Sequence, residues 1–194
     1  MMLRSINAFL LALFLVGASL QAARVQTLEA VPKPLVSQPK LAMQAVEQAR
    51  THWKAGRLTQ ALATVEAALQ LEPKDLSLRF MRGSLLYETN RLDESTQQFN
   101  DLAEQFPELA EVHNNLASLH ARAGKFDLAR LSLERALQAQ PAYALAWENL
   151  AAVLARQSVQ ALERAEEIAK TNERKRIEIK IKAARDLSDR LLKP

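Results

Sequence analysis

Cysteine is absent from this 194-residue chain, glycine occurs only four times, and aromatic residues make up 5% of it. Without cysteine the chain has no disulfides, no thiolate metal ligands and no thiol nucleophile. The sequence also contains no glycine-rich phosphate loop, nucleophile elbow or His-Glu metal motif. We therefore expect a non-catalytic protein that needs no cofactor.

Histidine is scarce as well, with His52, His113 and His120 as the three examples. His113 and His120 are seven residues apart, which is two helical turns or about 10 Å. That distance is too long for both to bind one metal ion, and all three fall where helices would pack. We expect core roles for them and predict no metal site.

The remaining composition is typical of an all-helical protein, because alanine, leucine, glutamine, glutamate and arginine dominate it. A period of 34 residues runs through the sequence. Helix-ending prolines and turn residues that tolerate a left-handed backbone both recur at this spacing. They are Pro73, Pro107 and Pro141, with Gly56, Asn90 and Gly124.

The unit is clearest in residues 111–141, where apolar residues at helical spacing predict two amphipathic helices joined at Gly124. The predicted stripes are Leu116, Leu119 and His120 in the first helix, and Leu128, Leu131, Leu133 and Leu137 in the second. Small residues fall where two helices must approach closely. They are Ala117, Ala129 and Ala136 in this copy, and Ala49, Ala61, Ala68, Gly83 and Ser95 upstream.

A helix–turn–helix unit repeated every 34 residues resembles the tetratricopeptide (TPR) repeat. Leu102 and Gln48 depart from the family pattern without breaking the period. The resemblance implies an all-α solenoid whose hairpins complete one another's core. The expected segments are full repeats at about 42–75, 76–109 and 110–143, a partial fourth at 144–157 marked by Trp147, Leu150 and Ala151, and a C-terminal capping extension at 158–194.

In the family, the first helix of each repeat lines a concave groove, which implies a set of partner-binding residues. They are Arg50, Trp53 and Lys54 from the first copy, Ser77, Ser84, Tyr87 and Glu88 from the second, Glu111, Asn114, Asn115, Ser118 and Arg122 from the third, and Glu148, Asn149 and Arg156 from the fourth. Asn115 and Asn149 are equivalent positions. In peptide-binding members an Asn there pairs with the backbone of an extended peptide, because an amide both donates and accepts. Bonding within the solenoid stays open as an alternative.

Positive charge in this set suits a carboxylate or an acidic peptide, and it comes from Arg50, Lys54, Arg122 and Arg156. The family's two-carboxylate clamp for chaperone tails requires a Lys-Asn pair in the first copy. Val46 and Arg50 occupy those places here. We therefore do not expect that particular ligand.

The first 23 residues have the layout of a secretory signal peptide. Arg4 is followed by an unbroken apolar run at residues 8–16, and cleavage is expected near Ala22 or Ala23, with Ala18 as an alternative. The rival interpretation is an uncleaved inner-membrane anchor, although a spanning helix needs about 20 apolar residues. We expect export to the bacterial periplasm. Residues 24–41 contain three prolines and are expected to form an extended linker.

The C-terminal extension has no turn glycine or internal proline, so the fourth first helix can continue into it. Its expected apolar stripes are Leu162, Ala165, Ile168 and Ala169, and then Ile177, Ile181, Ala184, Leu187 and Leu191. The alternation at 177–182 also fits a short strand, but the helical flanks favour a helix. Residues 159–194 hold 10 basic and 7 acidic side chains.

The basic side chains of this extension could contact anionic lipid, at about 1 kcal/mol each near the surface, or form a solvated helix. The set is Lys170, Arg174, Lys175, Arg176, Lys180 and Lys182. Nucleic acid is not expected, because no aromatic residues interleave the charges.

The sequence thus predicts a non-catalytic scaffold or adaptor of the bacterial cell envelope that holds a partner peptide or helix in its groove. No small-molecule substrate is expected. A membrane-surface adaptor and a homo-oligomeric structural protein are the alternatives.

Overall fold

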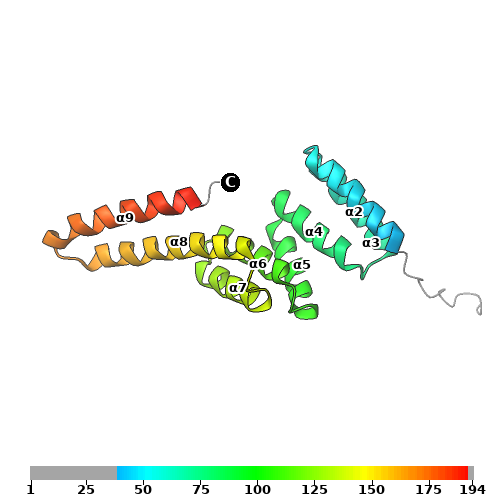
Figure 1. Cartoon of the computed structure of the whole chain (residues 1–194). Coiled ribbons are helices and arrows are strands. Elements are labelled where there is room, and N and C mark those ends of the chain that lie inside the picture. Colours follow the sequence, from blue (N-terminus) through cyan, green and yellow to red (C-terminus); the bar gives the residue numbers. More distant parts are fainter. Residues whose placement is uncertain (1–38, 192–194) are drawn as a thin grey trace, which may run out of the picture. The chain divides into compact units, whose positions relative to one another are not determined.

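The computed structural model describes residues 39–191. The predicted signal peptide and most of the predicted linker lie outside the described residues. Residues 39–191 form eight helices and no strand (Figure 1). The helices are α2 (Pro39–Lys54), α3 (Leu58–Leu71), α4 (Leu76–Glu88), α5 (Leu92–Gln105), α6 (Ala110–Arg122), α7 (Phe126–Ala139), α8 (Ala144–Ile168) and α9 (Thr171–Leu191). Among them, none is long and apolar enough to cross a membrane.

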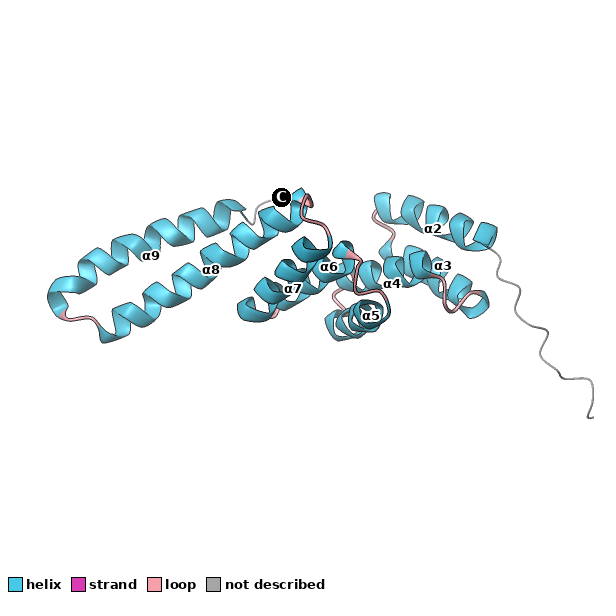
Figure 2. Ribbon diagram, turned by 60° about the horizontal axis from the view of Figure 1, so that its bottom comes forward, coloured by secondary structure: helices cyan, strands magenta, loops and turns pink. Residues whose placement is uncertain are grey.

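These helices pack as consecutive hairpins, and each helix contacts the next one along the chain (Figure 2). The first helices of successive hairpins, α2, α4, α6 and α8, also contact one another in order. This arrangement confirms the predicted all-α fold of helical hairpins. Each helix therefore packs mainly against helices that are close to it in the sequence, because each hairpin completes the interior of its neighbour.

Three of the hairpin turns share one geometry, which follows from the 34-residue period. The second residue after the first helix takes a positive φ, which lets the chain reverse without a helical clash. These φ values are +72° at Gly56, +62° at Asn90 and +71° at Gly124. In each turn the next N–H donates to a carbonyl five residues back, from Arg57 to His52, Arg91 to Leu86 and Lys125 to His120, each at 2.9 Å.

The core of each of the first three hairpins pairs a small residue in the first helix with a larger one 16 residues later. All six residues are buried, and they are Ala49 with Val65, Gly83 with Phe99, and Ala117 with Leu133. In each pair the larger residue of the second helix fills the space that the small residue of the first helix leaves. A Cβ built on Gly83 would lie 2.9 Å from two ring carbons of Phe99, inside normal contact distance.

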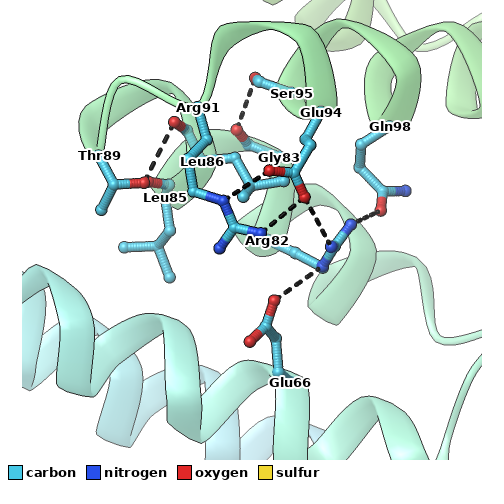
Figure 3. A network of polar contacts seen from close by, with 10 residues as sticks. All are labelled: Glu66, Arg82, Gly83, Leu85, Leu86, Thr89, Arg91, Glu94, Ser95 and Gln98. Atoms are coloured by element: carbon cyan, nitrogen blue, oxygen red, sulfur yellow. Dashed lines mark hydrogen bonds and ion pairs between the residues drawn. The ribbon is translucent and has the colours of Figure 1, made fainter.

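A polar network fastens the second hairpin to its neighbour (Figure 3). The Arg82 guanidinium lies 3.4 Å from Glu66 on α3 and 3.9 Å from Glu94 on α5, and it donates to Gln98 at 3.0 Å. On the same hairpin, the Ser95 hydroxyl donates to the Gly83 carbonyl at 2.8 Å. One arginine therefore connects three helices through a single guanidinium.

Some predicted details are corrected by the structure. Helix α2 begins at Pro39, inside the segment expected as linker, because proline suits the first position of a helix. In α7 the expected stripe was too wide. Leu128 and Leu131 are 45% and 44% exposed, and the buried stripe consists of Ala129, Ser132, Leu133 and Ala136.

The C-terminal extension is helical throughout, including the alternating segment at 177–182. Helix α8 runs across the expected boundary at 157/158 without a break, and α9 returns along it. The expected stripes need correction. Ile168 is 86% exposed, and α9 buries Ile177, Ile181 and Ser188 while Leu187 is 53% exposed. A helix turns 100° per residue, so Leu187 cannot share the face of Ile177 and Ser188.

Candidate functional site

A hollow of about 870 Å³ lies against the first helices of three successive repeats, and we call it the α2–α4 hollow. Helices α2 and α4 form most of its wall, and the start of α6 closes one end. Its position follows from the stacking of hairpins, which leaves one side of each first helix uncovered. Its lining residues are Val46, Arg50, Trp53, Lys54, Leu76, Ser77, Phe80, Met81, Ser84, Leu109 and Glu111.

The floor of the α2–α4 hollow is apolar. Phe80 contributes a half-buried ring whose orientation is fixed by an edge-to-face contact with Phe99, with centroids 5.5 Å apart. Met81 beside it is also buried, with 8% of its surface exposed. A flexible thioether next to an aromatic ring adapts to ligands of different shape. The floor therefore suits one or two apolar side chains.

The rim of the same hollow carries charge. Arg50 and Lys54 are exposed on α2, one helical turn apart, and Glu111 stands at the α6 end. The Arg50 guanidinium is 3.4 Å from Glu47 on its own helix, an exposed pair that contributes little. Both cations are thus accessible to an anionic group above the apolar floor.

A second hollow of about 420 Å³, the α6–α8 hollow, lies against the third and fourth first helices. Arg122 stands over the Tyr87 ring, 5.0 Å from its centroid, and donates to Asn90 at 2.8 Å. Arg156 pairs with Asp189 of α9 at 3.2 Å. This hollow therefore has two cations held in place by neighbours. It is lined by Tyr87, Ala117, Ser118, Ala121, Arg122, Phe126, Leu133, Asn149, Ala152, Val153 and Arg156.

The asparagines expected to contact a peptide are engaged within the protein. Asn149 donates from Nδ2 to Oδ1 of Asn114 at 2.8 Å, and Asn115 donates to the Glu111 carbonyl at 2.9 Å. Asn114 is 94% buried, since only 6% of it is exposed, so it acts as a fixed support. Asn149 reaches the α6–α8 hollow, whereas Asn115 lines neither hollow.

The predicted groove residues are thus divided between two places. The α2–α4 hollow collects Arg50, Trp53, Lys54, Ser77, Ser84 and Glu111, and the α6–α8 hollow collects Tyr87, Ser118, Arg122, Asn149 and Arg156. Asn114, Asn115, Glu88 and Glu148 line neither. Sequence reasoning missed the apolar floor at Phe80, Met81 and Leu109. The repeat register could have found Phe80, because it is equivalent to Asn114, which was predicted to line the groove.

The histidines do not form an active site. His113 is buried and its Nε2 lies 2.8 Å from the Pro107 carbonyl, on the side where α5, α6 and α7 meet around a separate hollow of about 660 Å³. Burial, with a smaller contribution from Lys125, lowers the pKa of His120, as expected for a packed imidazole. Within residues 39–191 no three His, Asp or Glu side chains cluster to hold a metal.

Stacked helical hairpins with hollows along their first helices define this chain as an α-helical repeat protein. The chain belongs to the tetratricopeptide repeat family, whose sequence profile matches residues 46–110 and 114–171. This is a scaffold fold that is typically non-catalytic. Among curated proteins none matches the chain.

Several solved TPR structures are similar to this chain. YrrB, described as a TPR protein with an unusual peptide-binding site, has 27% identity and a TM-score of 0.50 over 53% of each chain, so the match spans about half of YrrB. The first TPR domain of Spaghetti (RPAP3), bound to the HSP90 peptide SRMEEVD, has 17% identity and a TM-score of 0.56 over 65% of this chain and 96% of that one. PcrH from Pseudomonas aeruginosa has 20% identity and a TM-score of 0.56, over 64% and 98%. The last two show the fold alone.

Proposed function

We propose that this protein is a non-catalytic scaffold that holds a partner peptide or helix in the α2–α4 hollow. The observation that carries the proposal is the combination of an apolar floor with an accessible basic rim in one hollow of about 870 Å³. Burying one apolar side chain on that floor would contribute about 1.5–3 kcal/mol. The rim would add selectivity for a nearby carboxylate rather than much further affinity.

The ligand class follows from these two parts. An apolar anchor would sit against Phe80 and Met81, and an acidic neighbour would meet Arg50 and Lys54. Peptide binding in YrrB and in the RPAP3 domain supports this use of the fold. The chaperone-tail clamp remains disfavoured, because Val46 and Arg50 replace its Lys-Asn pair.

The α6–α8 hollow would continue the same binding path. Asn149 is oriented by its bond to Asn114, which uses one N–H of its amide. We propose that its remaining polar atoms meet the peptide backbone. The expected role of Asn115 is weaker, because Asn115 lines neither hollow, whereas Ser118 lines the α6–α8 hollow.

Selection from a random peptide display library tests the proposal without a known partner. Selected peptides should share an apolar residue with Asp or Glu nearby, and Arg50→Glu with Lys54→Glu should weaken them at least tenfold. The matched control reverses two exposed charges elsewhere, Lys74→Glu with Lys125→Glu, and should retain binding. Peptides that bind both double variants equally would overturn the proposal.

We propose an envelope location, supported by the signal-like sequence of residues 1–23. Cell fractionation should recover a shortened chain in the soluble periplasm. A chain that keeps its N-terminus and sediments with membranes would instead support the anchored alternative.

Contact with an anionic membrane is a second candidate, favoured by one observation. Six exposed basic residues lie between Lys170 and Lys182, just before and along the first half of α9, and the ion pairs of this hairpin use Arg156 and Arg185 instead. Ile179 is 65% exposed among them. The six are Lys170, Arg174, Lys175, Arg176, Lys180 and Lys182.

This candidate predicts flotation with phosphatidylglycerol vesicles, lost at high salt and in Lys175→Glu with Lys180→Glu. The Lys74→Glu and Lys125→Glu double variant is the control of equal charge. No flotation at low salt would exclude the membrane role and leave peptide binding untouched.

A further inference from the structure

One face of α8 is uncovered at Ala151, although the equivalent small residue is buried in every earlier repeat, at Ala49, Gly83 and Ala117. Residues 117 and 151 are one period apart. Ala117 is 1% exposed against its partner helix α7, whereas Ala151 is exposed. One turn further on, Leu86 in α4 is 0% exposed, whereas its equivalent Leu154 is 47% exposed. The fourth repeat thus has its first helix without the covering second helix.

The cause is the path of α9. In the earlier hairpins the second helix covers the face of the small residue, as Phe99 of α5 covers Gly83. In the last hairpin α9 contacts α8 alone among the described helices. The residues buried on that part of α8 are Ala152, Ala155 and Val159, together with Val153, which packs in the cluster of Leu133 and Ala136 on α7. Helix α9 therefore occupies a different face, and the position of a regular second helix is open.

The uncovered face is a charge-free stripe along the whole helix. Its residues follow one another at alternating spacings of four and three, the period of a coiled-coil seam. Trp147 is 55% exposed and its indole N–H is held by the Pro141 carbonyl at 3.0 Å. We call this stripe the α8 seam; it consists of Trp147, Ala151, Leu154, Ser158, Ala161, Ala165 and Ile168.

The α8 seam lies opposite the polar side of the last hairpin. Two ion pairs connect the helices there, Arg156 with Asp189 and Glu163 with Arg185. Leu154 is separated from Arg156 by about 160° around α8, because each residue turns the helix by 100°. Helix α9 also exposes two large apolar side chains, Ile179 at 65% and Leu187 at 53%. Such a concentration of exposed apolar side chains marks an interaction surface.

We infer that a second copy of this chain covers the α8 seam, with the two α8 helices antiparallel about Ser158. In this register small residues meet near the centre, where they let the helices approach closely, and two large residues meet at the ends. Leu154 lies opposite Ala161 of the second copy, and Ala151 lies opposite Ala165. At the ends Trp147 meets Ile168, and two Ser158 residues face each other on the two-fold axis. Such a contact uses the same patch on both copies, as a two-fold dimer requires.

A second copy is the occupant that fits the α8 seam, because the seam is complementary to itself. No charged residue lies within the seam, so two copies bring no like charges together in its centre. The inference is independent of the peptide-binding hollows, which lie on α2, α4, α6 and the groove side of α8.

Light scattering of the full-length chain, in whichever form the cell leaves its N-terminus, tests the dimer. The wild type should have twice the chain mass, and Leu154→Glu should raise the dimer dissociation constant roughly a hundredfold, because two leucines leave the interface and two carboxylates enter it. Leu145→Glu is the matched control. Leu145 is also 47% exposed on α8 but points about 180° away, and this variant should stay dimeric.

Cross-linking tests the register, since the natural chain has no cysteine. Ser158→Cys should form a disulfide-linked dimer on mild oxidation, whereas Gln160→Cys should not. A mixture of Leu154→Cys and Ala161→Cys chains should cross-link more than either alone. Within one helix these positions are about 10 Å apart, too far for an internal disulfide.

A monomeric wild type at all concentrations would overturn the inference. So would a dimer whose mass Leu154→Glu leaves unchanged. Monomeric binding to phosphatidylglycerol vesicles that Leu154→Glu abolishes would overturn it too, and would identify lipid as the occupant.

Discussion

Gly83→Ala is the sharpest stability test of the repeat register. The structure predicts both the loss of stability that it causes and a second substitution that should restore part of that stability. The added methyl would lie 2.9 Å from two ring carbons of Phe99 and 3.2 Å from a third. Carbon atoms prefer about 3.5–4.0 Å. Phe99 is fully buried, so its ring cannot move aside into solvent.

The magnitude follows from two opposed effects. Overpacking a tight core costs about 1–3 kcal/mol, whereas alanine is better than glycine in a helix by about 1 kcal/mol. The expected net loss is about 1 kcal/mol. For a chain of this size that lowers Tm by roughly 2–4 °C.

The assay is a double-mutant cycle by thermal and denaturant unfolding. Phe99→Leu alone should destabilise the protein by leaving a cavity. The double variant recreates the Ala–Leu pair of the next repeat, Ala117 with Leu133, and should be more stable than the sum of the single effects by about 1 kcal/mol. A higher Tm for Gly83→Ala, or strictly additive effects, would refute the reasoning.

Three further predictions concern stability. Gly124→Ala meets no atom within 4 Å but has φ +71°, so it should cost about 1–2 kcal/mol through backbone strain alone, measured as a lower denaturant midpoint. Burial lowers the pKa of His120, so the unfolded chain takes up that proton first and stability falls as pH drops through about 6.5. His120→Gln should therefore reduce the Tm difference between pH 8 and pH 5. The lowered pKa of Glu94 places its titration below this range. Arg82→Met should cost about 1 kcal/mol by releasing three partners, whereas Arg130→Met, which breaks only an exposed pair within one helix, should stay within about 0.5 kcal/mol by urea unfolding.

The repeated hairpins could be predicted because their signals are local. A positive φ is needed at the turn, and Gly56, Asn90 and Gly124 are residue types that tolerate it. Helical periodicity then located seven of the described helices in three and a half repeats. The groove side stays a prediction from the register, and two of its residues, Arg50 and Arg122, each line a hollow.

The last hairpin could not be predicted in the same detail, because no glycine or proline marks its turn. Both Ile177 and Leu187 belong to apolar rows of α9, and the sequence merged two rows that face different directions. The apolar floor was missed for another reason. Phe80 could equally fill the core, and only the structure shows that it lines the α2–α4 hollow while its ring packs edge-to-face against Phe99.

The most direct test of the peptide-binding claim uses the two tryptophans of the chain in one NMR titration. Trp53 lines the α2–α4 hollow, whereas Trp147 lies on the α8 seam. With Trp147→Phe assigning the two indole N–H signals, a library-selected peptide should shift the Trp53 signal to saturation and leave the Trp147 signal in place. A saturable shift of Trp147 with an unmoved Trp53 would contradict the assignment of the binding site.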